Sequence, residues 1–112
     1  MSKRDNTILL EDIFEALESI FEYTAEKEFE EFRNTKMMRD AVYRNFEIIG
    51  EAANRLTNDF VENHSNVNWH KVIGLRNRII HAYFDIDDDI IWTIIKNDLP
   101  ALKTQVEKIL MN

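Results

Sequence analysis

The stretch of sequence that decides the fold is VYRNFEIIGEAANRLTNDF, residues 42–60. Its apolar residues recur at alternating steps of four and three, the spacing that places side chains on one face of an α-helix. That face consists of Val42, Phe46, Ile49, Ala53, Leu56 and Phe60. The pattern predicts a long helix over about residues 35–62, whose apolar seam packs against other helices.

Gly50 lies in the middle of this stretch. Inside a helix, glycine costs roughly 1 kcal/mol relative to alanine, so its presence calls for a compensating reason. The sequence therefore predicts that another helix crosses closely at Gly50.

Helical periodicity continues towards the N-terminus. A helix over about residues 7–24 is predicted by the 4-3-4 spacing of Ile13, Leu17, Ile20 and Thr24. The charged residues 26–31, EKEFEE, predict a turn or short helix that serves as a solvated connection.

Towards the C-terminus, two more helical regions are predicted. Asn68 is a suitable N-cap for a helix that starts at Trp69 and ends around residues 81–83. The last region covers about residues 87–110. Within it, Asp98 and Pro100 mark either the start of a new helix or a kink.

The composition of the chain is that of one globular domain. Its 45% apolar and 31% charged residues are typical of a soluble protein, and 112 residues suffice for one core. With two glycines, one proline and no strand-like alternation, residues 1–112 are expected to form a single all-α domain of four main helices. No apolar run is long enough for a membrane span, and no leader precedes the first helix, so a cytoplasmic protein is expected.

Charge and cysteine content exclude several classes of function. Without cysteine, neither a disulfide framework nor a thiolate metal site can form. The net charge of −7 argues against nonspecific coating of nucleic acid, which depends on lysine and arginine. A local cationic cleft remains compatible with that charge, since three of the seven arginines, Arg55, Arg76 and Arg78, are close in sequence.

The aspartates at 85, 87 and 89 have the spacing of a calcium loop, but the rest of that motif is missing. A calcium loop requires glycine at its sixth position and glutamate at its twelfth, where this chain has Ile90 and Lys96. Acidic residues in the first turn of a helix are explained by their favourable interaction with the helix dipole. No metal is expected there.

The other potential metal ligands are equally weak candidates. Glu47 and Glu51 lie one turn apart, but neither has the histidine three residues later that di-iron bundles use. A solvated face or an ion pair between helices is expected for them. His64 and His70 are isolated and are expected at the surface, without a zinc site.

Residues 76–83, RNRIIHAY, concentrate the side chains needed for phosphodiester chemistry. Arginine binds phosphate through a planar fork, histidine transfers protons near neutral pH, and tyrosine offers a hydroxyl. On a helix, Asn77 and His81 face the same way, and Arg76 and Tyr83 are nearly eclipsed. Periodicity leaves a structural alternative open, in which the arginines make surface ion pairs and Tyr83 belongs to the core.

The pattern Arg76…His81-Ala82-Tyr83 resembles the signature of the HEPN superfamily, and specifically its HepT-like branch. The resemblance extends over essentially the whole chain. It includes residues 39–52, Trp69 with residues 73–77, and Trp92 with residues 98–100. Ala82 is a small departure, since glycine is typical of the branch at that position.

The resemblance implies a four- to five-helix up-and-down bundle of the HEPN type that forms a homodimer, with the two motifs meeting in a shared cleft. It also implies a metal-independent endoribonuclease toxin, without cofactor, that is paired with a nucleotidyltransferase antitoxin. By the same resemblance, Arg76 and His81 are catalytic and act on an RNA substrate. Asn77 is a supporting polar contact, and Tyr83 accepts AMP from the antitoxin, which blocks the toxin.

Two other functions remain open at the level of sequence. The chain could be a non-catalytic accessory subunit that binds nucleotide or substrate for a nucleotidyltransferase. It could also be a dimeric scaffold, in which case loss of the Arg76 side chain would change neither activity nor binding.

Overall fold

The computed structural model describes residues 3–79 and 88–112, and the helices within these ranges confirm the all-α prediction. Neither range contains a strand. Residues 75–79, just after α5, are also helical. The helices are α1 (Lys3–Thr24), α2 (Phe29–Asn34), α3 (Lys36–Asn54), α4 (Asn58–Asn63), α5 (Trp69–Ile73), α7 (Asp88–Asn97) and α8 (Leu99–Met111).

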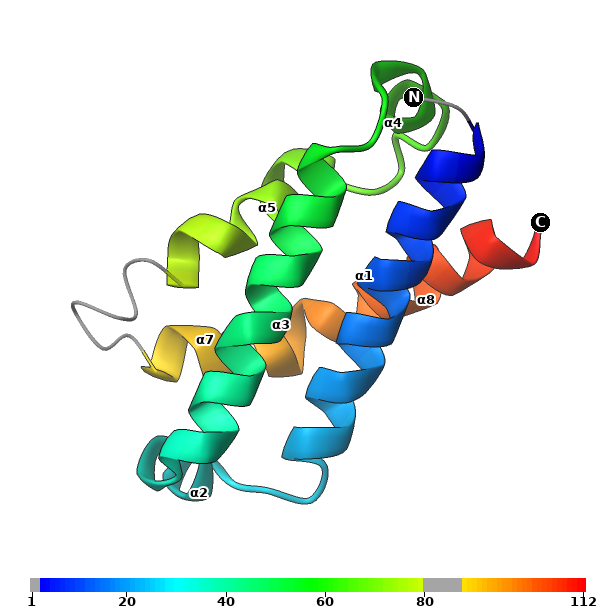
Figure 1. Ribbon diagram of the computed structural model, residues 1–112. Helices are drawn as coiled ribbons and strands as arrows, with labels where there is room; N and C mark the ends of the chain where they lie inside the picture. Colours follow the sequence, from blue (N-terminus) through cyan, green and yellow to red (C-terminus); the bar gives the residue numbers. More distant parts are fainter. Residues whose placement is uncertain (1–2, 80–87) are drawn as a thin grey trace.

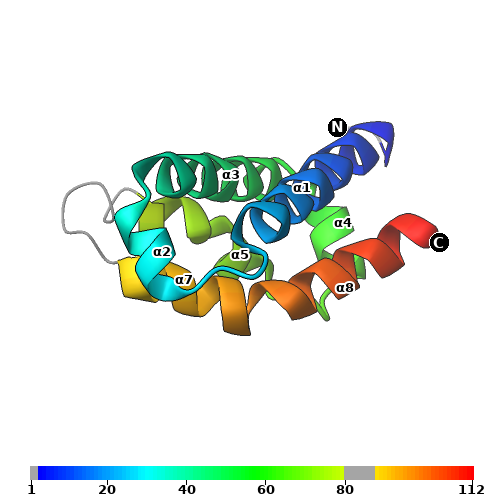
Figure 2. The same ribbon diagram turned by 90° about the horizontal axis from the view of Figure 1, so that it is seen from below.

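The helices pack in two layers. Helices α1 and α3 lie side by side (Figure 1), and α7 and α8 run beneath them (Figure 2). Helix α5 packs against α3, so α3 is flanked by α1 and α5. The long helix predicted from residues 42–60 therefore lies at the centre of the bundle.

The predicted seams form the core. Val42, Phe46 and Ile49 of α3 have no exposed side-chain surface. They share one hydrophobic core with equally buried residues of α1 and α7, because each of these helices presents a stripe of apolar side chains to the same interior. The fully buried residues on those two partners include Ile13, Leu17, Ile20, Ile91 and Ile95.

The prediction of one helix over residues 35–62 is wrong in its extent. Helix α3 ends at Asn54, and α4 begins at Asn58. The side chain of Thr57 caps α4 by accepting a hydrogen bond from the backbone N–H of Phe60 at 3.3 Å. The backbone N–H of Thr57 itself donates to Asn6 of α1 at 3.1 Å, so this group is withdrawn from the α3 ladder.

The short, solvated connection expected at residues 26–31 is confirmed, since a short helix begins at Phe29 and all six residues except the half-buried Phe29 are exposed. Helix α2 turns its charged residues outward and buries Phe32 completely. The ring centroid of Phe32 lies 5.2 Å from that of Trp92 and 6.5 Å from that of Tyr43. Helix α2 thus closes one end of the core.

The two C-terminal regions follow the predicted signals. Asn68 caps α5, since its side chain accepts a hydrogen bond from the backbone N–H of Lys71 at 3.1 Å. The helix predicted from Trp69 is interrupted at Gly74, and its predicted end at residues 81–83 lies outside the described residues. At Asp98 a new helix starts with Pro100 in its first turn, although the Asp98 side chain makes no capping hydrogen bond.

Among the described helices, none combines the length and the apolar character that a membrane span would require.

Candidate active site

Arg76 is held between α5 and α3 by an ion pair. Its Nη1 donates to Oε1 of Glu51 on α3 at 2.6 Å, and 41% of the Arg76 side chain remains exposed. The ion pair between helices expected for Glu51 is therefore confirmed. Because a guanidinium carries five N–H donors, the bond to Glu51 leaves further donors of Arg76 for an incoming anion.

The backbone at Arg76 is packed directly against Gly50. A Cβ atom added to Gly50 would lie 2.8 Å from the Cβ of Arg76 and 2.9 Å from its backbone nitrogen. The carbonyl oxygen of Ile73 would be 3.1 Å away. The predicted close crossing is confirmed, and it brings Arg76 as near to α3 as the two backbones allow.

The remaining predicted site residues divide into two groups. Asn77 and Arg78 are exposed, and their backbone N–H groups donate to the carbonyl of Gly74 at 3.0 and 3.2 Å. His81 and Tyr83 lie outside the described residues. The expected approach of His81 and Tyr83 to Arg76 therefore stays a prediction.

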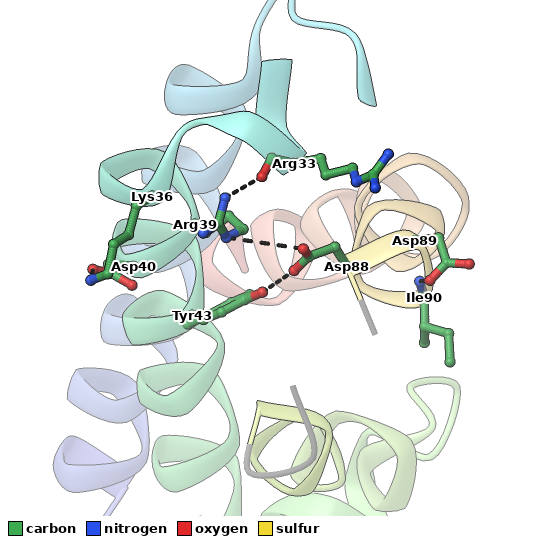
Figure 3. A network of polar contacts seen from close by, with 8 residues as sticks. All are labelled: Arg33, Lys36, Arg39, Asp40, Tyr43, Asp88, Asp89 and Ile90. Atoms are coloured by element: carbon green, nitrogen blue, oxygen red, sulfur yellow. Dashed lines mark hydrogen bonds and ion pairs between the residues drawn. The ribbon is translucent and has the colours of Figure 1, made fainter. Parts of the chain in front are cut away.

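A second polar network lies where α7 begins (Figure 3). The hydroxyl of Tyr43 on α3 donates to Oδ1 of Asp88, and Nε of Arg39 lies 4.0 Å from Oδ2 of the same carboxylate. Arg39 also donates through Nη1 to the carbonyl of Arg33 at the end of α2. One network thus joins α2, α3 and α7.

Within this network the Tyr43–Asp88 pair is buried, whereas Arg39 is partly exposed, and the burial changes the chemistry of the tyrosine. Tyr43 and Asp88 are each only 5% exposed. Burial, followed by the hydrogen bond to Asp88 and the negative charge of that carboxylate, raises the pKa of Tyr43 well above its ordinary value. Tyr43 therefore remains a neutral hydrogen-bond donor throughout the physiological pH range.

Sequence reasoning missed this network, although one signal for it was present. Tyr43 lies next to Val42 in the apolar seam of α3, and a buried tyrosine hydroxyl needs an acceptor. The spacing of the aspartates in residues 85–89 indicates metal ligands or helix-end charges, and neither interpretation includes a hydrogen bond to a tyrosine. Asp88, in the first turn of α7, also serves as that acceptor.

The potential metal sites yield no cluster in the part of the chain that is described. Across residues 3–79 and 88–112, no group of three or more histidine, aspartate or glutamate side chains could hold a metal ion. Asp85 and Asp87 lie outside these ranges. Asp89 accepts a hydrogen bond from the backbone N–H of Ile90 at 3.1 Å, as expected for an acidic residue in the first turn of a helix.

A groove of about 580 Å³ lies between the α5 side of the molecule and helices α7 and α8. Arg78 and Leu75 line it from one side, and Leu99 and Leu102 line it from the other. Lys71 and Asp98, which form an ion pair at 3.4 Å, connect the two walls. The groove combines an apolar floor with cations and carboxylates, and its volume is that of a small-molecule pocket.

Charge is distributed unevenly over the described surface. Residues 63–79 contain no aspartate or glutamate but include Lys71, Arg76 and Arg78. Helix α1, by contrast, carries Glu11, Asp12, Glu15, Glu18 and Glu22, which are all exposed. Two of these three cations are paired with carboxylates from other parts of the fold, Arg76 with Glu51 and Lys71 with Asp98, so their positive charge is partly offset.

Comparisons with known proteins agree with this picture. The family model described as "Ribonuclease HepT-like" matches residues 13–109. The chain is 48% identical over 107 residues to a "Putative RNase" of Methanocaldococcus jannaschii, covering 96% of this chain and 98% of that protein. It is 43% identical over 107 residues to "Probable ribonuclease HepT" of Thermococcus cleftensis, covering 96% and 97%. No solved structure matches the chain significantly.

Proposed function

Because the chain belongs to the HepT-like ribonuclease family of HEPN proteins, we propose that it is the endoribonuclease toxin of a toxin–antitoxin pair. The names of its relatives refer to ribonucleases, which supports RNA as the substrate. The observation that carries the proposal is Arg76, half-exposed and anchored at the crossing with Gly50, five residues before His81 in the sequence.

In the proposed reaction, RNA is cleaved without a metal ion. The 2′-hydroxyl of a ribose loses its proton to a general base and attacks the adjacent phosphorus, and the P–O5′ bond breaks. A general acid protonates the departing 5′-oxygen, which leaves a 2′,3′-cyclic phosphate and a 5′-hydroxyl. His81 is assigned these proton transfers because an imidazole with a pKa of about 6.5 can act in both directions.

Arg76 is assigned the stabilisation of charge on the phosphoryl oxygens. A fixed cation is most effective where negative charge develops in the transition state. Glu51 supports this role because it holds Nη1 and orients the planar group, while the side chain of Arg76, 41% exposed, keeps further N–H donors for a phosphate. Asn77, exposed and next in the chain, is assigned a supporting contact to the substrate.

The proposed active form is a homodimer in which the two motifs share one cleft. In such a cleft the His81 of one protomer serves as the base and the His81 of its partner as the acid. An isologous interface allows this arrangement, because the same residues of both protomers meet near the two-fold axis.

Tyr83 is the proposed site of regulation. A cognate nucleotidyltransferase antitoxin would transfer AMP from ATP to the phenol oxygen of Tyr83, with release of pyrophosphate. The added phosphodiester places negative charge and bulk beside Arg76. The phosphate of the AMP group then repels the phosphates of RNA and binds Arg76 in their place.

The test of the proposed reaction is cleavage of labelled RNA by the purified chain. Wild-type protein is expected to cleave with equal rates in the presence and absence of a chelator. His81→Ala is expected to abolish cleavage, since proton transfer by a positioned side chain contributes about 10²–10⁴-fold. His70→Ala, an exposed histidine on α5, serves as the matched control. Cleavage that persists in His81→Ala would remove His81 from the reaction.

The proposed regulation is tested by intact-mass spectrometry after co-expression with a candidate nucleotidyltransferase antitoxin. A mass increase in units of AMP is expected, and peptide mapping should assign it to Tyr83. Tyr83→Phe should abolish the increase, whereas Tyr23→Phe on α1 should leave it unchanged. A product that carries no AMP would contradict the pairing.

One observation favours a second candidate, a nucleotide-binding accessory subunit that cleaves nothing. The groove beside Arg78 combines an apolar floor with Lys71 and Asp98, a chemistry suited to a base and a phosphate. This candidate predicts saturable binding of a nucleotide and no RNA cleavage at any protein concentration. The cleavage assay above separates the two functions.

A further inference from the structure

Helix α3 is attached to the chain on both sides of residues 80–87. Before these residues, Gly50 and Glu51 contact Arg76, and Ile79 is completely buried. After them, Tyr43 binds Asp88, the first residue of α7. The part of the chain that contains His81 and Tyr83 in sequence is therefore bracketed by two attachments to one helix.

The two attachments lie on the same side of α3. Arg39, Tyr43 and Gly50 are separated by steps of four and seven residues, which places them along one face of a helix. Because α3 is a continuous helix over Lys36–Asn54, the distance between these attachments is fixed by a rigid element. Arg76 and Asp88 are thus attached to one rigid helix, and catalysis tolerates only small displacements of the groups that support it.

Stability alone is a weak explanation of the attachment at Asp88. Asp88 is 5% exposed, and a buried carboxylate loses solvation that an ion pair rarely recovers in full. Its cation, Arg39, is 4.0 Å away, and its hydrogen bond comes from the neutral Tyr43. Replacing a buried polar group and its partners with apolar residues is often neutral or stabilising, so a geometric role accounts better for this network.

We propose that Tyr43 is a positioning residue for RNA cleavage. Tyr43 acts through Asp88, because its hydrogen bond fixes the start of α7, which follows His81 and Tyr83 in the sequence. This inference rests on the proposed function, and it adds a residue that does not itself touch the substrate. Arg39 is assigned the same positioning role, because it interacts with the second oxygen of the Asp88 carboxylate. Its bond to the carbonyl of Arg33 also connects the network to α2.

Steady-state RNA cleavage by Tyr43→Phe tests the inference. The substitution removes one oxygen and keeps the ring that packs edge-on against Phe32. We expect kcat to fall about tenfold or more with KM unchanged, because a misplacement of about 1 Å can cost about a hundredfold in rate. The kcat of Tyr43→Phe should be lower by the same factor at every pH, with unchanged apparent pKa values, since no group that titrates in the assay range is removed.

Three further variants separate positioning from a general loss of structure. Asp88→Asn retains an oxygen that can accept the Tyr43 hydrogen bond, so it should keep more of kcat than Asp88→Ala. Tyr23→Phe removes the hydroxyl of a tyrosine on α1 that is 41% exposed, and its kcat should equal that of wild type. All rates are divided by the folded fraction from thermal melts of the same preparations.

The outcomes distinguish this inference from the proposed function. If wild type cleaves, His81→Ala does not, and Tyr43→Phe has an unchanged kcat per folded molecule, the positioning role alone is rejected. A rise in KM at constant kcat would also reject it. If wild type cleaves no RNA at any concentration, the proposed function and this inference are rejected together.

Discussion

At the scale of single residues, Gly50 sets the distance between α3 and Arg76. Glycine is unfavourable within a helix, but here any side chain would collide with the backbone nitrogen of Arg76, which has no rotamer with which to move away. The position of the proposed catalytic arginine therefore depends on a residue that contributes no functional group.

Gly50→Ala is expected to destabilise the protein and to lower RNA cleavage. Alanine gains roughly 1 kcal/mol in helix propensity, but overpacking at 2.8–2.9 Å from Arg76 typically costs about 1–3 kcal/mol. Thermal denaturation gives the stability, and RNA cleavage reports the displacement of Arg76. Gly74→Ala is the control, because its nearest contacts, at 3.3 and 3.4 Å, are carbonyl oxygens of its own turn. Equal effects of the two substitutions would contradict this account.

Residue-level sequence reasoning succeeded where local chemistry decides the outcome. The crossing at Gly50 and the cap at Asn68 were predictable, since each follows from the type of one residue and its place in a helical pattern. For Glu51 an ion pair was one of two alternatives, and its partner Arg76, 25 residues away, was not predicted. The partner of Tyr43 was not predictable either, because Asp88 is 45 residues away in sequence. Spacing along the chain carries no information about which of several aspartates a fold brings to a given tyrosine.

At the scale of elements, the break between α3 and α4 shows how one contact overrides a periodic pattern. The apolar repeat continues through Leu56 to Phe60, and this is why one helix was predicted. The side chain of Asn6 intervenes from α1: it donates to Oγ1 of Thr57 at 2.9 Å and accepts from its backbone N–H at 3.1 Å. A helix end decided by another helix cannot be read from its own periodicity.

Asn6→Ala is expected to lower the free energy of unfolding by about 1–3 kcal/mol, because it leaves the N–H of Thr57 without its partner in a part-buried place. Asn6 itself is 5% exposed, so water has poor access to replace it. Urea denaturation measures the change. Asn58→Ala, at an exposed position in the first turn of α4, should be close to neutral. If the Asn6 variant were as stable as wild type, the bridge would have no role in ending α3.

At the scale of the whole molecule, the proposed dimer makes a quantitative prediction about mixed assemblies. If one cleft needs an imidazole from each protomer, a wild-type chain paired with His81→Ala is inactive. Equal amounts of the two chains, unfolded and refolded together, should then retain about a quarter of the wild-type activity, since random pairing around a two-fold axis leaves that share of wild-type pairs. Retention of about half of the wild-type activity would instead indicate that each protomer has its own independent active site.

The control for this experiment uses the same mixing with Lys108→Ala, an exposed position on α8. That mixture should keep full activity, which shows that refolding itself costs nothing. Sedimentation of each mixture gives the oligomeric state, and a monomer that cleaves RNA would contradict the shared cleft.

The segregation of charge between α1 and residues 63–79 has a consequence for the approach of RNA. Because α1 and α5 pack on either side of α3, the exposed carboxylates of α1 and the cations of residues 63–79 contribute an electric dipole moment, which the ion pairs of Lys71 and Arg76 reduce. A polyanion at a distance experiences both contributions: the net charge of −7 repels it, while the dipole turns the arginines towards it. At low ionic strength the repulsion acts over the longer range, so moderate salt is expected to accelerate encounter before further salt weakens the phosphate contacts.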